Sequence, residues 1–195
     1  MKKWLLVSLS FLSLHAFAQD RTMSIQHLQN ANSYFSISVT DDGTLSGTYP
    51  GWCVDWNRLI QDDTPYPVKF YSSIRDNFPA GVVAHPENLD EMNWLLNKKF
   101  VGKTAPNGLG VYTSGDVQVA IWTLIDDNFQ TDTVGPFSQA RVDTLVELAM
   151  TKGSGYYPKC RELVGIILDP GEEQGTVIEV PKYRFVKCHV PDGDE

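Results

Sequence analysis

The stretch Gly115–Asn128 has the apolar spacing of a helix with one buried face, and it constrains the fold more than any other segment. Its apolar side chains recur three and four residues apart, at Val117, Ala120, Ile121, Leu124 and Ile125. Ser114 or Asp116 can cap the start of this helix by accepting a hydrogen bond from a free backbone N–H group. Gln118 lies beside the apolar stripe, one turn before Trp122, so we expect its amide to point into or along the packed interface. A primary amide in such a place is either a hydrogen-bonded residue at the edge of the core or a group with a chemical role.

The first 18 residues predict a secretory signal peptide rather than a part of the fold. Two lysines precede an apolar run, Trp4–Phe17, and the segment ends in the A-x-A pattern of a cleavage site. We therefore expect cleavage after Ala18 and a mature chain of residues 19–195 that forms a single domain. No later apolar run is long enough to cross a bilayer, which predicts a secreted or periplasmic protein without a membrane span.

The order of periodic segments in the mature chain is strands, then helices, then strands. Strands are expected at residues 33–39, 51–56, 68–73, 163–168 and 176–187, and helices at 86–97, 115–128 and 138–153. This order predicts an α+β fold, in which a β-sandwich or barrel-like domain carries an inserted helical lobe at about residues 85–153.

The charge pattern argues against several classes of partner. The chain has a formal net charge of −8 at pH 7 and no basic cluster, which disfavours nucleic acids and anionic membrane surfaces. The acidic pairs Asp62-Asp63 and Asp126-Asp127 lack the alternating pattern of a calcium-binding loop. We therefore predict no metal site and no cofactor.

All three cysteines, Cys53, Cys160 and Cys188, lie in the part of the chain expected to be exported, where thiols normally pair. We favour a Cys160–Cys188 disulfide because these two residues flank a predicted pair of strands. This pairing leaves Cys53 as a free thiol between two tryptophans. A Cys53–Cys160 disulfide with Cys188 free is the alternative that the sequence leaves open.

Cys53 and Gln118 stand in short motifs that resemble those of the bacterial thioester domains of cell-surface adhesins. In these domains a cysteine next to an aromatic residue bonds to the glutamine of a Thr-Gln-x-Ala-(Ile/Val)-Trp motif. The matching residues here are Trp52-Cys53 and Val117–Trp122 (VQVAIW), with Val117 at the position of the threonine. The resemblance also extends to the order of strands and helices and spans most of the mature chain.

The resemblance implies an internal thioester between Cys53 and Gln118. An amine or hydroxyl on a surface or extracellular-matrix protein or polysaccharide would take the Gln118 acyl group, leaving an amide (isopeptide) or ester bond. Such capture happens once per molecule and is not enzymatic turnover. Trp52 and Trp122 would shield the bond, and Asp55 or Tyr112 would assist proton transfer. The positive end of the helix would lower the pKa of the thiol and polarise the acyl oxygen.

Two other functions remain open at this point. The first is a non-covalent secreted binding or structural module with the same fold, in which Cys53 is a small buried residue that never reacts. The second is a cysteine hydrolase or acyltransferase, for which His27, His85 and His189 are the candidate bases. No local signature of a cysteine protease surrounds Cys53.

Overall fold

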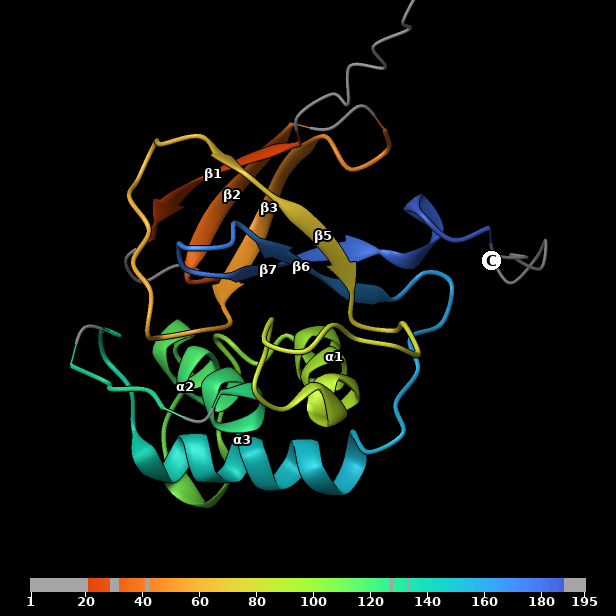
Figure 1. The fold of residues 1–195 in the computed structure, drawn as a ribbon. Helices are drawn as coiled ribbons and strands as arrows, with labels where there is room; N and C mark the ends of the chain where they lie inside the picture. The colour runs from red at the N-terminus through yellow and green to blue at the C-terminus, as the bar shows by residue number, and fades with distance from the viewer. Residues whose placement is uncertain (1–20, 29–31, 41–42, 127, 133, 188–195) are drawn as a thin grey trace, which may run out of the picture.

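The computed structural model describes residues 21–28, 32–40, 43–126, 128–132 and 134–187. Within these residues, seven strands form one antiparallel sheet in the order β4-β1-β2-β3-β7-β6-β5 (Figure 1). The strands are β1 (Thr22–His27), β2 (Phe35–Thr40), β3 (Gly47–Cys53), β4 (Tyr66–Pro67), β5 (Lys69–Ser72), β6 (Leu163–Asp169) and β7 (Thr176–Pro181). The predicted signal peptide lies outside the described residues, so the signal peptide and the extent of the domain stay predictions.

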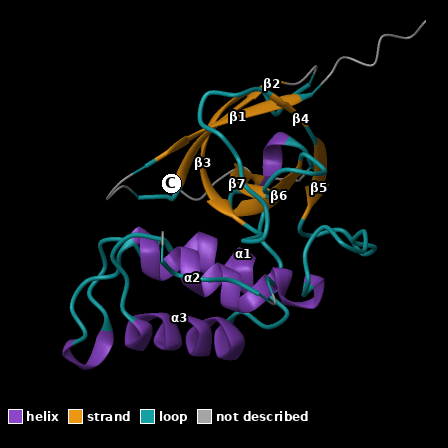
Figure 2. Cartoon of the chain, turned by 60° about the vertical axis from the view of Figure 1, so that its left-hand side comes forward, coloured by secondary structure: helices purple, strands orange, loops and turns teal. Residues whose placement is uncertain are grey.

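Three helices form a second layer beneath the sheet (Figures 1 and 2). They are α1 (Leu89–Lys98), α2 (Ser114–Ile125) and α3 (Gln139–Lys152). A short 3-10 turn at Pro86–Asn88 leads into α1, and another at Pro106–Gly108 lies between α1 and α2. Helix α1 packs against β6 and α2 against β3, while α3 covers the outer side of both helices. The α+β prediction is therefore confirmed, with a curled, barrel-like sheet and the helices inserted between β5 and β6.

Several expectations about the strands differ from the structure. The strand expected at residues 51–56 is part of β3, which begins at Gly47 and ends at Cys53. The last strand ends at Pro181 instead of continuing to residue 187, because proline cannot donate to the ladder, and a 3-10 turn at Lys182–Arg184 follows. The sequence analysis did not predict the first strand, β1. Its two buried apolar residues, Met23 and Ile25, form an alternating pattern that is too short to indicate a strand. In the described part of the chain, no helix is both long and apolar enough to cross a membrane.

The start of α2 is fixed by a capping box that differs from the predicted cap. Thr113 is the N-cap residue, rather than Ser114 or Asp116, and its hydroxyl accepts a hydrogen bond from the Asp116 N–H at 3.2 Å. The Asp116 carboxylate in turn accepts from the Thr113 N–H at 2.7 Å and from the Ser138 N–H at 2.7 Å. Its ion pair with Arg141, at 2.6 Å, joins α2 to α3. These contacts hold the first turn of α2, from which Gln118 projects.

Candidate functional site

The side-chain amide of Gln118 is hydrogen-bonded at both of its ends to the backbone of Cys53. Its oxygen accepts from the Cys53 N–H at 2.9 Å, and its nitrogen donates to the Cys53 carbonyl at 2.8 Å. Both residues are completely buried. The structure therefore brings together the two residues that the sequence analysis predicted to react.

The end of β3 explains why an amide fits at this place. Strand β2 pairs with β3 only as far as Gly51, whose carbonyl accepts from the Tyr34 N–H at 3.1 Å. Cys53 lies two residues further along β3, so its N–H and carbonyl point toward the same side, where no strand continues. Gln118 from α2 supplies one acceptor and one donor there, and so satisfies a pair of buried backbone groups.

The Cys53 thiol is protonated and held by a local hydrogen bond. Its sulfur donates to the backbone carbonyl of Asp55 at 2.8 Å. Burial raises the pKa of the Cys53 thiol well above its ordinary value, and the carboxylates of Asp55 and Asp126 raise it further. The prediction that the start of α2 lowers this pKa is therefore wrong, because loss of solvent outweighs every favourable contact. The acyl oxygen is polarised by the N–H of Cys53 itself rather than by free N–H groups of the helix.

Trp122 provides the main side-chain contact that favours the thiolate. Its interaction with Cys53 lowers the pKa of the thiol against the larger effect of burial. Its indole N–H is buried and has no hydrogen-bond partner in the described part of the protein. A buried donor without a partner is costly. Negative charge on the Cys53 sulfur would therefore be stabilised by a hydrogen bond from this N–H.

Aromatic rings close the site around Trp122. The Trp122 ring stacks on Phe129 at 5.7 Å and makes edge contacts with Trp56 at 5.4 Å and Tyr34 at 6.4 Å. Burial raises the pKa of the Tyr34 hydroxyl, and proximity to Cys53 raises it further. The sequence analysis missed Tyr34 and Phe129, and nothing in their local patterns indicates that they meet Trp122. Together these rings keep water away from the sulfur.

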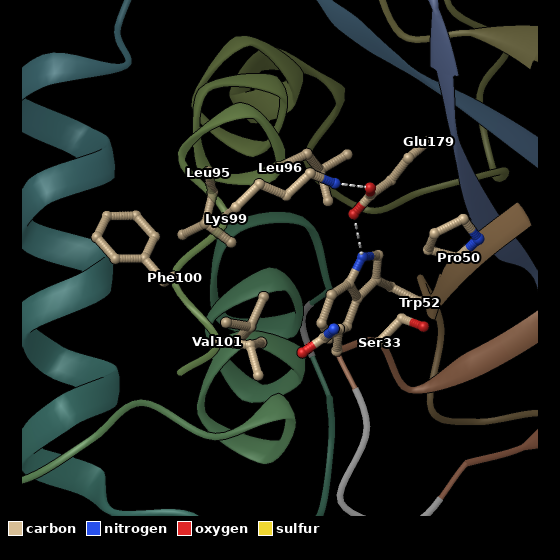
Figure 3. A pocket seen from close by; sticks show the side chains of 11 residues that line it. Ser33, Pro50, Trp52, Leu95, Leu96, Lys99, Phe100, Val101 and Glu179 are labelled. Atoms are coloured by element: carbon tan, nitrogen blue, oxygen red, sulfur yellow. Dashed lines mark hydrogen bonds and ion pairs between the residues drawn. The ribbon is translucent and has the colours of Figure 1, made fainter. Parts of the chain in front are cut away.

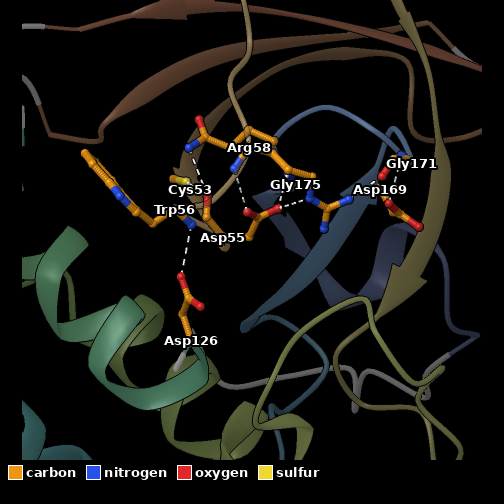
Figure 4. A network of polar contacts seen from close by, with 9 residues as sticks. Cys53, Asp55, Trp56, Arg58, Asp126, Asp169, Gly171 and Gly175 are labelled. Atoms are coloured by element: carbon orange, nitrogen blue, oxygen red, sulfur yellow. Dashed lines mark hydrogen bonds and ion pairs between the residues drawn. The ribbon is translucent and has the colours of Figure 1, made fainter. Parts of the chain in front are cut away.

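Asp55 holds the loop after Cys53 and does not direct its carboxylate at the thiol (Figure 4). The carboxylate pairs with Arg58 at 2.7 Å and accepts from the Gly175 N–H at 3.2 Å. Figure 4 also shows Trp56 donating its backbone N–H to Asp126, at 3.0 Å, at the C-terminal end of α2. The predicted role of Asp55 in proton transfer stays a prediction, and the observed contacts are those of a loop anchor.

The recorded contacts of Trp52 and Tyr112 are with residues other than Cys53 and Gln118. Successive side chains of a strand point to opposite faces, so Trp52 points away from the Cys53 side chain and donates its indole N–H to Glu179 at 3.0 Å. Tyr112 packs on Phe100 at 5.4 Å near the start of α2. Its buried hydroxyl has no partner among the described residues. Their shielding and proton-transfer roles stay predictions.

Cys53 is a free thiol. Cys188 lies outside the described residues, so the Cys160–Cys188 pairing stays a prediction.

The candidate bases for a cysteine hydrolase lie either on the surface or outside the described residues. His27 pairs with Asp62 at 2.5 Å and His85 with Glu87 at 2.9 Å, and both side chains are well exposed. His189 lies outside the described residues. Within the described ranges, no group of three or more histidine, cysteine, aspartate or glutamate side chains is placed to hold a metal ion. Neither described histidine is positioned to activate the buried thiol.

The fold resembles that of the thioester domains of bacterial surface adhesins. The similar solved structures are 12–13% identical in sequence, so the likeness concerns the fold alone. No family model matches the sequence, and no curated protein matches it.

Three of these structures illustrate the likeness. The N-terminal domain of the pilus tip adhesin Cpa from Streptococcus pyogenes is 13% identical, with 83% of this chain and 94% of that chain covered and a TM-score of 0.48. The N-terminal thioester domain of a surface protein from Clostridium perfringens is 13% identical, with coverage of 83% and 99% and a TM-score of 0.47. The thioester domain of fibronectin-binding protein SfbI from Streptococcus pyogenes is 12% identical, with coverage of 82% and 92% and a TM-score of 0.45.

Proposed function

We propose that this protein forms an internal thioester between Cys53 and Gln118 and uses it once, to attach itself covalently to a target. The observation that carries the proposal is the pair of hydrogen bonds that holds the Gln118 amide against the Cys53 backbone, at 2.9 and 2.8 Å. Reaction of a thiol with a primary amide is slow unless both groups are held together and water is excluded. The two hydrogen bonds hold the Gln118 amide at Cys53, and the complete burial of both residues excludes water, which supports the proposal.

Thioester formation would require only groups of Cys53, Gln118 and Trp122. The Cys53 sulfur attacks the amide carbon of Gln118, and the carbonyl oxygen takes up negative charge while it accepts from the Cys53 N–H. The carbon–nitrogen bond then breaks, and the amide nitrogen leaves as ammonia with the proton lost by the thiol. The Trp122 indole N–H offsets part of the cost of negative charge on the buried sulfur. The products are a thioester and one ammonia.

Target capture transfers the Gln118 acyl group from the Cys53 sulfur to a nucleophile of the target. An amine or hydroxyl attacks the Gln118 acyl carbon, the carbon–sulfur bond breaks, and the proton of the nucleophile passes to the Cys53 sulfur. The product is an amide or ester bond to the target and a free thiol. A secreted protein of this kind would capture a nucleophile on a surface or matrix protein or polysaccharide, and would act in adhesion.

Intact mass of the purified mature protein, before and after methylamine treatment, tests the proposal. We expect a mass short by one ammonia, then addition of methylamine at Gln118 and release of the Cys53 thiol. Peptide mapping separates this loss of ammonia from that of a cyclised N-terminal Gln19. A Cys53→Ala variant should retain the ammonia and take up no methylamine. Full mass of the wild-type protein with a titratable Cys53 thiol would contradict the proposal.

One observation favours a second candidate, a non-covalent secreted binding module. The Gln118 amide already completes the hydrogen bonding of the Cys53 backbone, and burial raises the pKa of the thiol, so the pair is also explained as a stable structural contact. This module would take up no methylamine, and Cys53→Ala would retain its binding to a surface. A thioester protein would lose its covalent attachment with the same substitution.

A further inference from the structure

A cavity of about 410 Å³ lies between the end of α1, the start of α2 and the adjoining ends of β3 and β7 (Figure 3). Most of its wall is apolar. The lining residues used below are Trp52, Leu96, Lys99, Phe100, Val101 and Glu179. Its volume falls in the range of cavities that hold small organic ligands, about 300–1,000 Å³.

A chain of polar contacts runs along one wall of this cavity (Figure 3). The Trp52 indole N–H donates to one carboxylate oxygen of Glu179 at 3.0 Å, and the Lys99 ammonium pairs with the other oxygen. The Glu179 side chain is only 4% exposed, whereas that of Lys99 is 51% exposed. Both oxygens of Glu179 are therefore engaged, and the ammonium retains N–H donors that can reach a ligand.

The backbone of Lys99 supports a specific role for this residue. Lys99 ends α1 with φ of 50° and ψ of 64°, in the left-handed region that favours glycine. A left-handed residue commonly ends a helix, but the position favours glycine, so a lysine there carries a cost in stability. Here the lysine side chain reaches Glu179 at the cavity wall.

We propose that this cavity binds a small apolar carboxylate, with its hydrocarbon part against Leu96, Phe100 and Val101 and its carboxylate on the Lys99 ammonium. The donors of Lys99 require a ligand that accepts hydrogen bonds, and Asn32 at the exposed rim can add an amide donor. A ligand amine would be repelled by the positive charge of Lys99. Glu179 would offer it little attraction, because both of its oxygens are already engaged. The proposal uses neither Cys53 nor Gln118 and is independent of thioester formation.

Titration calorimetry with 4-phenylbutyrate on the full mature protein tests this site. We expect saturable one-to-one binding, and weaker binding of 4-phenylbutylamine, which has the same apolar part. Lys99→Met should weaken binding of the carboxylate about tenfold or more, because it removes a charged hydrogen-bond donor. Lys152→Met, which removes the same charge from the exposed end of α3, should leave the affinity unchanged.

A second variant keeps the test decisive if Lys99→Met unfolds the protein. Val101 is half-buried at the cavity, so Val101→Trp should fill the space without disturbing the core and abolish binding. Circular dichroism confirms that each variant is folded. Absence of saturable binding to the wild type, equal binding of the amine, or unchanged binding in folded Lys99→Met or Val101→Trp would each overturn the proposal.

Discussion

The Gln118 side chain takes the position beside Cys53 that a neighbouring strand would occupy. Its amide accepts from the Cys53 N–H at 2.9 Å and donates to the Cys53 carbonyl at 2.8 Å, although the two residues are 65 positions apart. One contact therefore has two consequences. It completes the hydrogen bonding of a buried strand end, and it holds the Gln118 side-chain amide against the backbone of the residue that carries the thiol. Stability and reactivity can be measured separately in variants of this pair.

Replacing Gln118 with leucine should destabilise the fold and prevent thioester formation. Measured in the Cys53→Ala background, where the Gln118 amide nitrogen is retained, the substitution leaves a buried backbone N–H and a buried carbonyl at position 53 without partners, at a cost of about 2–4 kcal/mol in the free energy of unfolding. Urea denaturation measures the cost. Gln139→Leu, on the exposed side of α3, is the matched control and should change stability by less than about 0.5 kcal/mol. Equal stability of the two variants would show that the Gln118 contact contributes nothing to folding.

Replacing Trp122 with phenylalanine should slow thioester chemistry more than it destabilises the fold. The ring contacts with Trp56 and Phe129 are largely retained, but the N–H beside the Cys53 sulfur is lost. We expect methylamine uptake to slow by about tenfold, the size of one hydrogen bond to a charged group. Timed mass spectrometry gives the rate. Trp94→Phe, a buried substitution on α1, should leave this rate unchanged, and equal rates in both variants would remove Trp122 from the mechanism.

Replacing Asp116 with asparagine should weaken the start of α2 and therefore the site as a whole. The carboxylate is fully buried, and it holds Thr113, Ser138 and Arg141 together. Its loss leaves the mostly buried Arg141 without an ionic partner, which costs about 3–5 kcal/mol. Thermal unfolding by circular dichroism measures the effect. The control variant Asp143→Asn, which replaces an exposed aspartate on α3, should lower Tm much less. A similar decrease in Tm for both variants would contradict a structural role of Asp116.

Glu91 should make the stability of the protein fall as the pH rises. Burial of this side chain in α1, together with a hydrogen bond that the protonated Glu91 donates to the Asp90 carboxylate, raises the pKa of Glu91 to about 7. The folded state therefore holds this proton more tightly than the unfolded state does. The contribution of this proton to the free energy of unfolding is fully present below the pKa that Glu91 has in the unfolded chain. It is lost as the pH rises through about 7, the pKa of Glu91 in the folded protein.

The variant Glu91→Gln tests this pH dependence because it keeps the shape of the protonated side chain. The gain in Tm relative to the wild type should be larger at pH 8 than at pH 5. Glu147→Gln, on the exposed face of α3, should shift Tm equally at both pH values. A Glu91→Gln shift that does not depend on pH would contradict the assignment.

Some features could be predicted because they depend on local spacing. The apolar stripe of residues 117–125 predicts the buried face of α2, and the turn and proline positions bracket the three helices. The pairing of Cys53 with Gln118 came from the resemblance of their short motifs to those of thioester domains. The structure places the Gln118 amide on the Cys53 backbone, and the covalent bond stays a proposal. The buried face of α2 follows from the sequence because the helical period decides which side chains share a face.

Other features were decided only when distant segments packed together. The sequence indicated an activated Cys53, but burial between β3 and α2 raises the pKa of its thiol. It did not indicate that the Trp52 indole bonds Glu179 or that Tyr34 and Phe129 meet Trp122, and the shielding role of Trp52 stays a prediction. Solvent exclusion and ring contacts depend on the joint arrangement of segments far apart in the chain, and no local pattern contains that arrangement.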